Sequence, residues 1–143
     1  MRRLILSPMG VIEFEVERTI KAPIEDVFAR LVDINGHNDW MPKKGSILRH
    51  TQQTSPGEPT LGTTFLDETT YGPTPGEIVE LHAPHTLVYH WWDRSTSGRL
   101  QTEGWPGYSL ERRPTTRRSC VTTRRCTPTV STVWRRRYSA ESP

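Results

Sequence analysis

The stretch from Val11 to Ile20 reads Val-Ile-Glu-Phe-Glu-Val-Glu-Arg-Thr-Ile and carries the clearest strand pattern of the chain. In it, apolar residues alternate with acidic ones: Ile12, Phe14 and Val16 with Glu13, Glu15 and Glu17. A period of two is typical of an antiparallel strand with one buried face and one face in water. The stretch therefore predicts a strand that turns its glutamates outward.

The next residues, Ala22-Pro-Ile-Glu-Asp-Val-Phe-Ala-Arg-Leu-Val-Asp33, predict a helix. Pro23 suits the first helical position, where its missing N–H is not needed. Apolar residues then recur at helical spacing and form one stripe, made of Ile24, Val27, Phe28 and Leu31. Asn35-Gly36 predicts the end of this helix. A short second helix or turn follows between His37 and Met41.

The residues from Gly45 onward show strand and turn patterns. The predicted strands are Ser46–Gln53, Leu61–Tyr71, Glu77–His82, Thr86–Asp93, Arg99–Trp105 and Gly107–Leu110. Gly72-Pro-Thr-Pro-Gly76 is interpreted as a breaker, and Ala83-Pro-His85 as a hairpin connection. One strand, two helices and a run of antiparallel strands, without internal repeats, indicate an α+β fold.

The Ala22-Pro23 helix start, followed by Val27-Phe28 and Trp40, resembles the opening of the START-like (SRPBCC) superfamily of polyketide cyclase/dehydrase and lipid transport proteins. The run Val79-Glu-Leu-His-Ala-Pro-His-Thr-Leu-Val-Tyr-His-Trp91 is similar to a proline-bent pair of strands in many members. The resemblance implies a helix-grip fold, in which an antiparallel sheet wraps around helices and a hydrophobic cavity. It also implies binding or transport of a small hydrophobic or aromatic molecule. The alternative is an enzyme of the polyketide cyclase/dehydratase kind.

Aromatic and apolar side chains are the candidates for lining such a cavity. The predicted ligand-binding residues are Trp40, Phe65, Tyr71, Leu87, Tyr89, Trp91 and Trp105. Alternation places Leu87, Tyr89 and Trp91 on one face of their strand and Val88, His90 and Trp92 on the other, and the first set is expected to face inward. An ordinary aromatic core remains the alternative for each of these residues.

No residue stands out as catalytic. A pocket histidine can act as a general acid or base near neutral pH, and His90 is the candidate for this role. His82, His85 and His90 do not have a spacing that would hold zinc, so no metal is predicted. Neither a phosphate-binding glycine loop nor a nucleophile motif is present, and no cofactor is predicted. The acidic residues are interpreted mostly as a solvated sheet face.

The composition changes sharply after Leu110. Up to Leu110 the chain has ten Lys/Arg and fourteen Asp/Glu, a net charge of −4; beyond it nine Arg and two Glu give +7, which together make the +3 of the whole chain. Residues 111–143 have no helical stripe to supply the long C-terminal helix that the resemblance implies. We therefore expect residues 11–110 to form an incomplete domain, residues 1–10 to be a disordered leader and residues 111–143 to be a disordered tail.

The tail has a second interpretation at the level of the gene. In a shifted reading frame, some hybrid codons of this segment, such as that of Arg125/Cys126, require apolar residues at positions that suit a strand and an amphipathic helix. The hypothesis is that residues 111–143 are translated out of frame. If the tail is genuine, its arginines favour binding to nucleic acid or anionic lipid instead, and Trp134 and Tyr138 can stack on bases. No span or signal peptide is apparent, whether translation starts at Met1 or Met9, so a cytoplasmic location is expected.

Overall fold

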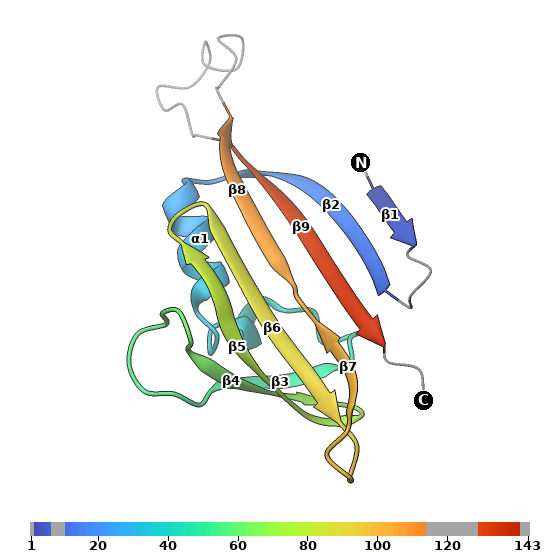
Figure 1. Ribbon diagram of the computed structural model, residues 1–143. Helices are drawn as coiled ribbons and strands as arrows, with labels where there is room; N and C mark the ends of the chain where they lie inside the picture. Colours follow the sequence, from blue (N-terminus) through green and yellow to red (C-terminus); the bar gives the residue numbers. More distant parts are fainter. Residues whose placement is uncertain (1, 7–10, 114–128, 141–143) are drawn as a thin grey trace, which may run out of the picture.

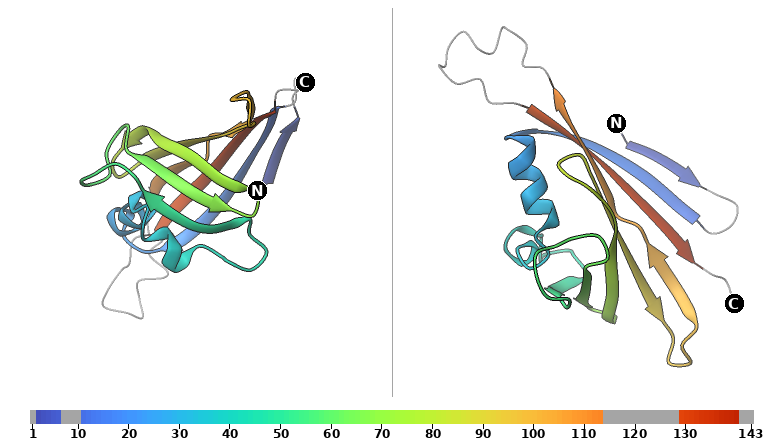
Figure 2. Two further views of the ribbon diagram at one scale, coloured as in Figure 1. Left: turned by 90° about the horizontal axis from the view of Figure 1, so that it is seen from below. Right: turned by 60° about the vertical axis from the view of Figure 1, so that its left-hand side comes forward.

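The computed structural model describes residues 2–6, 11–113 and 129–140. The elements follow in the order β1 (Arg2–Leu6), β2 (Val11–Lys21), α1 (Ile24–Val32), α2 (His37–Trp40), β3 (Leu48–Gln53), β4 (Thr64–Thr69), β5 (Gly72–His82), β6 (Thr86–Arg94), β7 (Leu100–Gly104), β8 (Gly107–Arg113) and β9 (Thr129–Ala140). The strands form one antiparallel sheet in the order β1-β2-β9-β7-β6-β5-β4-β3, and β8 pairs with β6 and β9. The sheet curls, and both helices lie on its inner side (Figures 1 and 2).

The predicted first strand and helix are confirmed with small shifts in their bounds. Helix α1 begins after Pro23, and its four buried residues are the predicted apolar stripe. Its end is held by Asp33, whose Oδ1 accepts a hydrogen bond from the Gly36 N–H at 3.1 Å. The helix therefore presents one apolar face to the sheet, as its sequence indicates.

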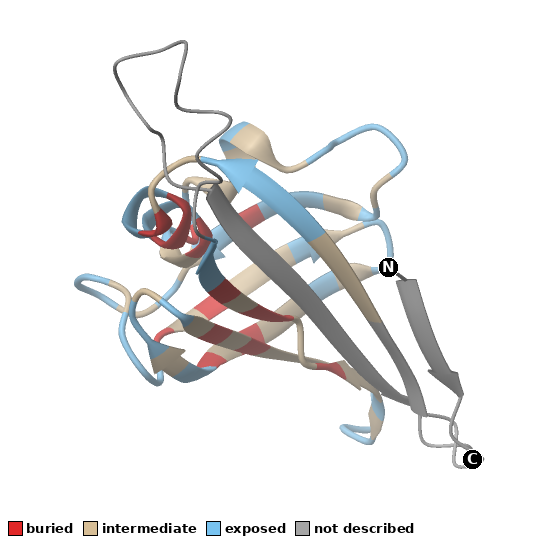
Figure 3. Cartoon of the chain, turned by 90° about the horizontal axis from the view of Figure 1, so that it is seen from above, coloured by how far each residue is buried: buried red, intermediate tan, exposed pale blue. Residues whose placement is uncertain are grey.

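The core lies between α1 and the middle of the sheet (Figure 3). The sheet contributes Phe65, Ile78, Leu87, Tyr89, Tyr108 and Leu110, and Ile34 follows the helix. Leu87 and Tyr89 are buried and Trp91 packs at the margin of this core, so the predicted inward face of β6 is confirmed. Each fully buried side chain of this size stabilises the fold by about 1.5–3 kcal/mol.

The free edge of β3 is covered by amide side chains. Asn38 Oδ1 accepts a hydrogen bond from the Thr51 N–H at 2.9 Å, and Asn38 Nδ2 donates one to the Thr51 carbonyl at 2.8 Å. Asn35 Oδ1 accepts a further bond from the Gln53 N–H at 2.9 Å. These side chains replace a neighbouring strand and make the edge unavailable for pairing with another chain.

The segment Gly72–Gly76 is part of β5, so its interpretation as a breaker is wrong. Pro73 and Pro75 pair with β4 at Glu68 and Leu66, while the pairing of β5 with β6 begins only at Gly76. A proline in a strand needs one side without a partner, because it has no N–H to donate. The first residues of β5 have such a side, because they pair with β4 and not with β6.

Both terminal segments differ from expectation. Arg2–Leu6 forms β1 against β2, β8 runs to Arg113, and Thr129–Ala140 pairs with β2 along its length. The β-branched and aromatic residues of β9 suit a strand, which explains why it fills this place in the sheet. Residues 7–10 and 114–128 lie outside the described residues, and within the described part no helix follows α2. The out-of-frame origin of the tail stays a prediction, which resequencing the codons for Tyr108 to Val121 tests.

Neither helix in the described part of the chain has the length and apolar character needed to cross a bilayer.

Candidate functional site

An aromatic cluster occupies the inner face beneath α2. It consists of His37, Trp40, Phe65 and Tyr89, and its rings meet edge to face: His37 lies 5.1 Å from Trp40 and 5.9 Å from Tyr89, and Phe65 lies 5.5 Å from Tyr89, measured between ring centroids. Such T-shaped pairs are a preferred aromatic geometry. Three of the predicted ligand-binding residues therefore lie together, and they are joined by a histidine.

The C-terminal end of α1 is tied to this cluster by one carbonyl. The Tyr89 hydroxyl donates a hydrogen bond to the Leu31 carbonyl oxygen at 2.6 Å, and His37 Nε2 donates to the same oxygen at 2.8 Å. Burial raises the pKa of Tyr89, and the nearby Tyr108, Asp67 and Asp33 raise it further. Burial lowers the pKa of His37, against the smaller opposing effects of the Leu31 carbonyl and Asp33. Both groups are therefore held neutral at pH 7.

The Trp40 indole brings an unpaired donor to the cluster. Its Nε1 is buried and has no hydrogen-bond partner among the described residues. A buried donor without an acceptor costs about 1–3 kcal/mol. An acceptor supplied by a ligand would remove this cost, so Trp40 is a candidate contact for one.

Two glycines let large rings approach the backbone of the sheet closely. The Phe65 ring covers Gly76, and the Trp91 ring covers Gly104, where an added Cβ would lie 2.7 Å from the indole. Gly76 and Gly104 are the register partners of Trp91 on its two sides. Trp91 is partly buried and packs against the margin of the core.

A carboxyl group continues the inner face beyond the rings. Asp67 follows Phe65 at strand spacing and pairs across the sheet with Thr51 and Thr74. Burial raises the pKa of Asp67, while a hydrogen bond from the Thr51 side chain and the charge of His50 act in the opposite direction. A half-buried carboxyl with a raised pKa is a candidate functional group, because proteins rarely bury one without a reason.

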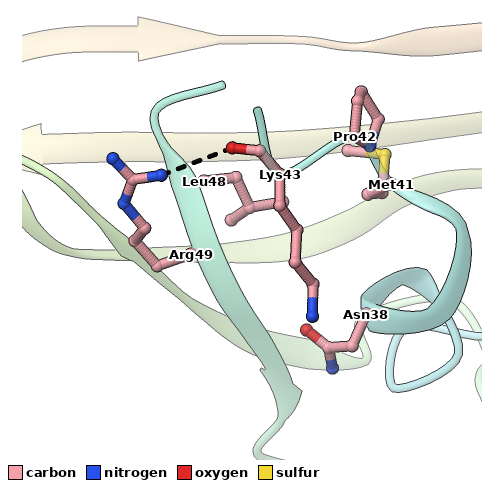
Figure 4. A pocket seen from close by; sticks show the side chains of 6 residues that line it. All are labelled: Asn38, Met41, Pro42, Lys43, Leu48 and Arg49. Atoms are coloured by element: carbon pink, nitrogen blue, oxygen red, sulfur yellow. Dashed lines mark hydrogen bonds between the residues drawn. The ribbon is translucent and has the colours of Figure 1, made fainter. Parts of the chain in front are cut away.

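A small hollow lies beside α2, between the α2–β3 connection and β3 (Figure 4). It measures about 10 Å³, room for about one water molecule, and is lined by Asn38, Met41, Pro42, Lys43, Leu48 and Arg49. None of the predicted ligand-binding side chains is in its wall. This hollow is therefore not the hydrophobic cavity that the resemblance implies.

Three of the residues singled out in the sequence lie away from the inner face. Tyr71 is 86% exposed in the β4–β5 turn. His90 points to the outer face, where its Nε2 donates to Glu103 Oε2 at 2.9 Å and its ring stacks on Trp105 with centroids 4.7 Å apart. Tyr71 and Trp105 therefore do not line a cavity on the inner face, and His90 is not placed to act as an acid or base there. Tyr71 lies in a turn, and strand alternation places His90, with Trp105 stacked on it, on the outer face.

Sequence reasoning missed His37 and Asp67. Asp67 was grouped with solvated acids, although its spacing of two from Phe65 places it on the inner face. His37 had no such signal, because its position depends on how the short α2 folds back over β6.

Solved structures match this fold over nearly the whole chain, although no protein-family model and no curated protein matches the sequence. An uncharacterised protein from Rhizobium leguminosarum has a TM-score of 0.57 at 12% identity, over 100% of this chain and 84% of the other. CalU16 from Micromonospora echinospora has a TM-score of 0.58 at 15% identity, over 99% and 71%. The di-domain ARO/CYC protein BexL of the BE-7585A biosynthetic pathway has a TM-score of 0.59 at 17% identity, over 93% and 37%. The likeness is one of fold, a curled antiparallel sheet with few helices, and it is consistent with the START-like resemblance of the sequence.

Proposed function

We propose that the inner face binds a small hydrophobic or aromatic molecule, with the ligand lying against Trp91. The observation that carries this proposal is the partly buried Trp91 ring, which closely approaches Gly104 at the edge of the packed core. An aromatic ring beside apolar side chains and a few polar groups is typical of a site for such ligands. The unpaired Trp40 Nε1 and the carboxyl of Asp67 are the polar groups available to orient the ligand.

The neighbouring tryptophans of β6 provide the test. Trp91 and Trp92 lie on opposite faces of the strand, so Trp91→Ala removes the proposed surface and Trp92→Ala is a matched control. Naphthols and anthracene carboxylates, titrated against intrinsic fluorescence, should bind the native chain and the control, and Trp91→Ala should lose about tenfold in affinity, as expected for one stacking contact. Equal losses in both variants, or no binding of any aromatic compound, would contradict the proposal.

A second candidate is a cyclase- or dehydratase-like enzyme working at the same face. Asp67 favours it, because a carboxyl whose pKa is raised by burial keeps its proton to a higher pH than a free carboxyl and can pass it to a bound substrate. The structural neighbour BexL is described as an ARO/CYC protein, and that description of BexL supports the second candidate. Turnover distinguishes the two candidates: an enzyme converts a bound substrate and should lose that turnover in Asp67→Asn, whereas a carrier shows no turnover in either chain.

Nucleic-acid binding by the tail stays a prediction that depends on the tail being genuine. The side chains beyond Arg113 lie outside the described residues, and nothing at the inner face bears on it.

A further inference from the structure

Two large apolar side chains stand exposed on adjoining segments at one end of the sheet. Ile47, just before β3, is 55% exposed, and Tyr71, in the β4–β5 turn, is 86% exposed. The Thr70 N–H donates to the Ile47 carbonyl at 3.0 Å and joins the two segments. Ile47, Tyr71 and the basic residues Lys43, Lys44 and Arg49 are together called the docking patch.

The turn holds Tyr71 outward in a defined position. Thr69 and Gly72 pair across it. The Tyr71 N–H donates to Thr69 Oγ1 at 3.1 Å, and that hydroxyl donates to the Gly72 carbonyl at 2.8 Å. Gly72 has a φ of 118°, which a residue with a Cβ rarely adopts. The exposure of Tyr71 is therefore built into a tight turn and requires no rearrangement before a partner binds.

The charge around these side chains differs from that of the remaining body. Residues 41–50 contain Lys43, Lys44 and Arg49 and no acidic residue, whereas the other residues up to 110 contain seven Lys/Arg and fourteen Asp/Glu. Arg49 Nη1 donates to the carbonyls of Lys43 at 3.4 Å and Ser46 at 3.3 Å, which holds its charge over the loop (Figure 4). Glu68, paired with His50 across β3 and β4, is the exposed acidic residue on the strand next to this segment, so the three cations of residues 41–50 outnumber it. A local excess of positive charge on an acidic body orients the molecule toward an anionic surface.

We propose that the docking patch binds a membrane surface that contains anionic lipids. Tyrosine and apolar side chains favour the boundary between headgroups and hydrocarbon, and neighbouring cations gain from anionic headgroups. The patch protrudes at a turn, a shape that enters a lipid headgroup layer more readily than it matches a folded partner over the area of a stable interface. The proposal is independent of ligand binding on the inner face, and either can fail alone.

The test follows the patch itself, because the arginines of the tail also attract anionic vesicles. In the full chain carrying Cys120→Ser and Cys126→Ser, an environment-sensitive fluorophore is attached at Tyr71→Cys or, as a matched control, at Thr60→Cys, which is exposed in the β3–β4 connection at the opposite end of β4. Phosphatidylcholine vesicles with phosphatidylserine should shift the emission of the label at position 71 to the blue and leave that at position 60 unchanged. Vesicles without phosphatidylserine should shift neither.

Charge reversal gives a second readout in the unlabelled chain. Lys43→Glu with Lys44→Glu should weaken co-sedimentation with the same vesicles by about 30-fold, the effect of losing two surface cations. Arg18→Glu with Lys21→Glu makes an equal change of charge at the end of β2 that precedes α1, away from the patch, and should cost about threefold or less. Circular dichroism confirms that each variant is folded.

Three outcomes would overturn the proposal. One is vesicle binding that shifts the labels at positions 71 and 60 alike, which would assign adsorption to another part of the chain. Another is equal loss of binding in the two charge-reversed variants. The third is binding to duplex DNA that is tighter than binding to vesicles and is lost with Lys43→Glu and Lys44→Glu, which would make the patch a nucleic-acid contact.

Discussion

The two faces of β6 show how one strand builds two different environments. On the inner face, Leu87, Tyr89 and Trp91 pack against α1, against α2 or over a glycine. On the outer face, His90 stacks on Trp105 and bonds Glu103, and Trp92 lies 5.1 Å from the His90 ring. The inner residues take their stability from a second layer, whereas the contacts of the outer ones, within the described part of the chain, are with side chains of the sheet and its connections. A change of one position along the strand should therefore change both the size and the cause of a mutational effect.

The largest difference is expected between Leu87 and its neighbour. Leu87 is completely buried, so Leu87→Ala should lower the free energy of unfolding by about 2–5 kcal/mol through lost burial and the cavity left behind. Val88→Ala on the outer face should cost about 1 kcal/mol or less. Urea unfolding of both variants measures the difference, and equal losses would contradict the assignment of the two faces.

A smaller effect is expected where a ring rests on the sheet. At Gly76 an added Cβ would meet the Phe65 ring and lie 2.7 Å from the His90 carbonyl oxygen. Because backbone cannot move aside, Gly76→Ala should cost about 1–3 kcal/mol. Thermal unfolding measures this, and an alanine variant as stable as the native chain would mean that Phe65 does not cover Gly76.

The hydroxyl of Tyr89 contributes less than its ring. Tyr89→Phe keeps the ring and removes the hydrogen bond to Leu31, while His37 still donates to that carbonyl. The free energy of unfolding should fall by about 1 kcal/mol. Tyr71→Phe, at the exposed turn, is the control and should be within about 0.5 kcal/mol of the native chain. A neutral Tyr89→Phe would show that the ring alone secures the end of α1.

The smallest expected effect is a pH dependence of the free energy of unfolding that comes from His37 on the inner face. Burial lowers the pKa of His37 below its usual value of 6.5, so the unfolded chain binds a proton that the folded chain does not. The free energy of unfolding should therefore decrease as pH falls below about 6.5, until the pKa of the folded state is reached. Asp67 acts in the opposite direction over its own range, because burial raises its pKa and the folded chain binds the proton more readily.

His37→Gln isolates this contribution, since Asp67 is present in both chains. As the pH falls from about 7.5 to about 5.5, the free energy of unfolding of the native chain should decrease more than that of the His37→Gln variant. A difference that does not change with pH would contradict the burial of a neutral His37.

Much of the fold was predictable because the residues concerned carry local periodicity. The stripe of α1 and the alternation of β6 each indicate their element and its buried face within about a dozen residues, and the alternation of β2 indicates its strand. The β5–β6 hairpin was equally readable from Ala83-Pro84-His85 between two apolar runs. The candidate site was predicted only in part: Trp40, Phe65, Leu87, Tyr89 and Trp91 lie on the inner face or at its margin, while Tyr71 and Trp105 do not.

The misplaced elements were those whose state depends on a distant neighbour. Pro73 and Pro75 enter β5 because one of its sides has no partner at that point. Residues 129–140 show little apolar periodicity, yet they form β9 because β2 offers an edge along its whole length. Composition alone favoured a tail outside the fold.

The sequence by itself determined the α+β class, the position and buried face of α1, and the inward set of β6, because hydrophobic periodicity is a local property of the chain. Only the tertiary structure decided that His37 and Tyr89 share the Leu31 carbonyl, that Asn38 covers the edge of β3, and that Trp91 lies over Gly104. These contacts join residues far apart in sequence, and their geometry depends on the curl of the sheet and the path of α2. No local pattern of residues encodes either of them.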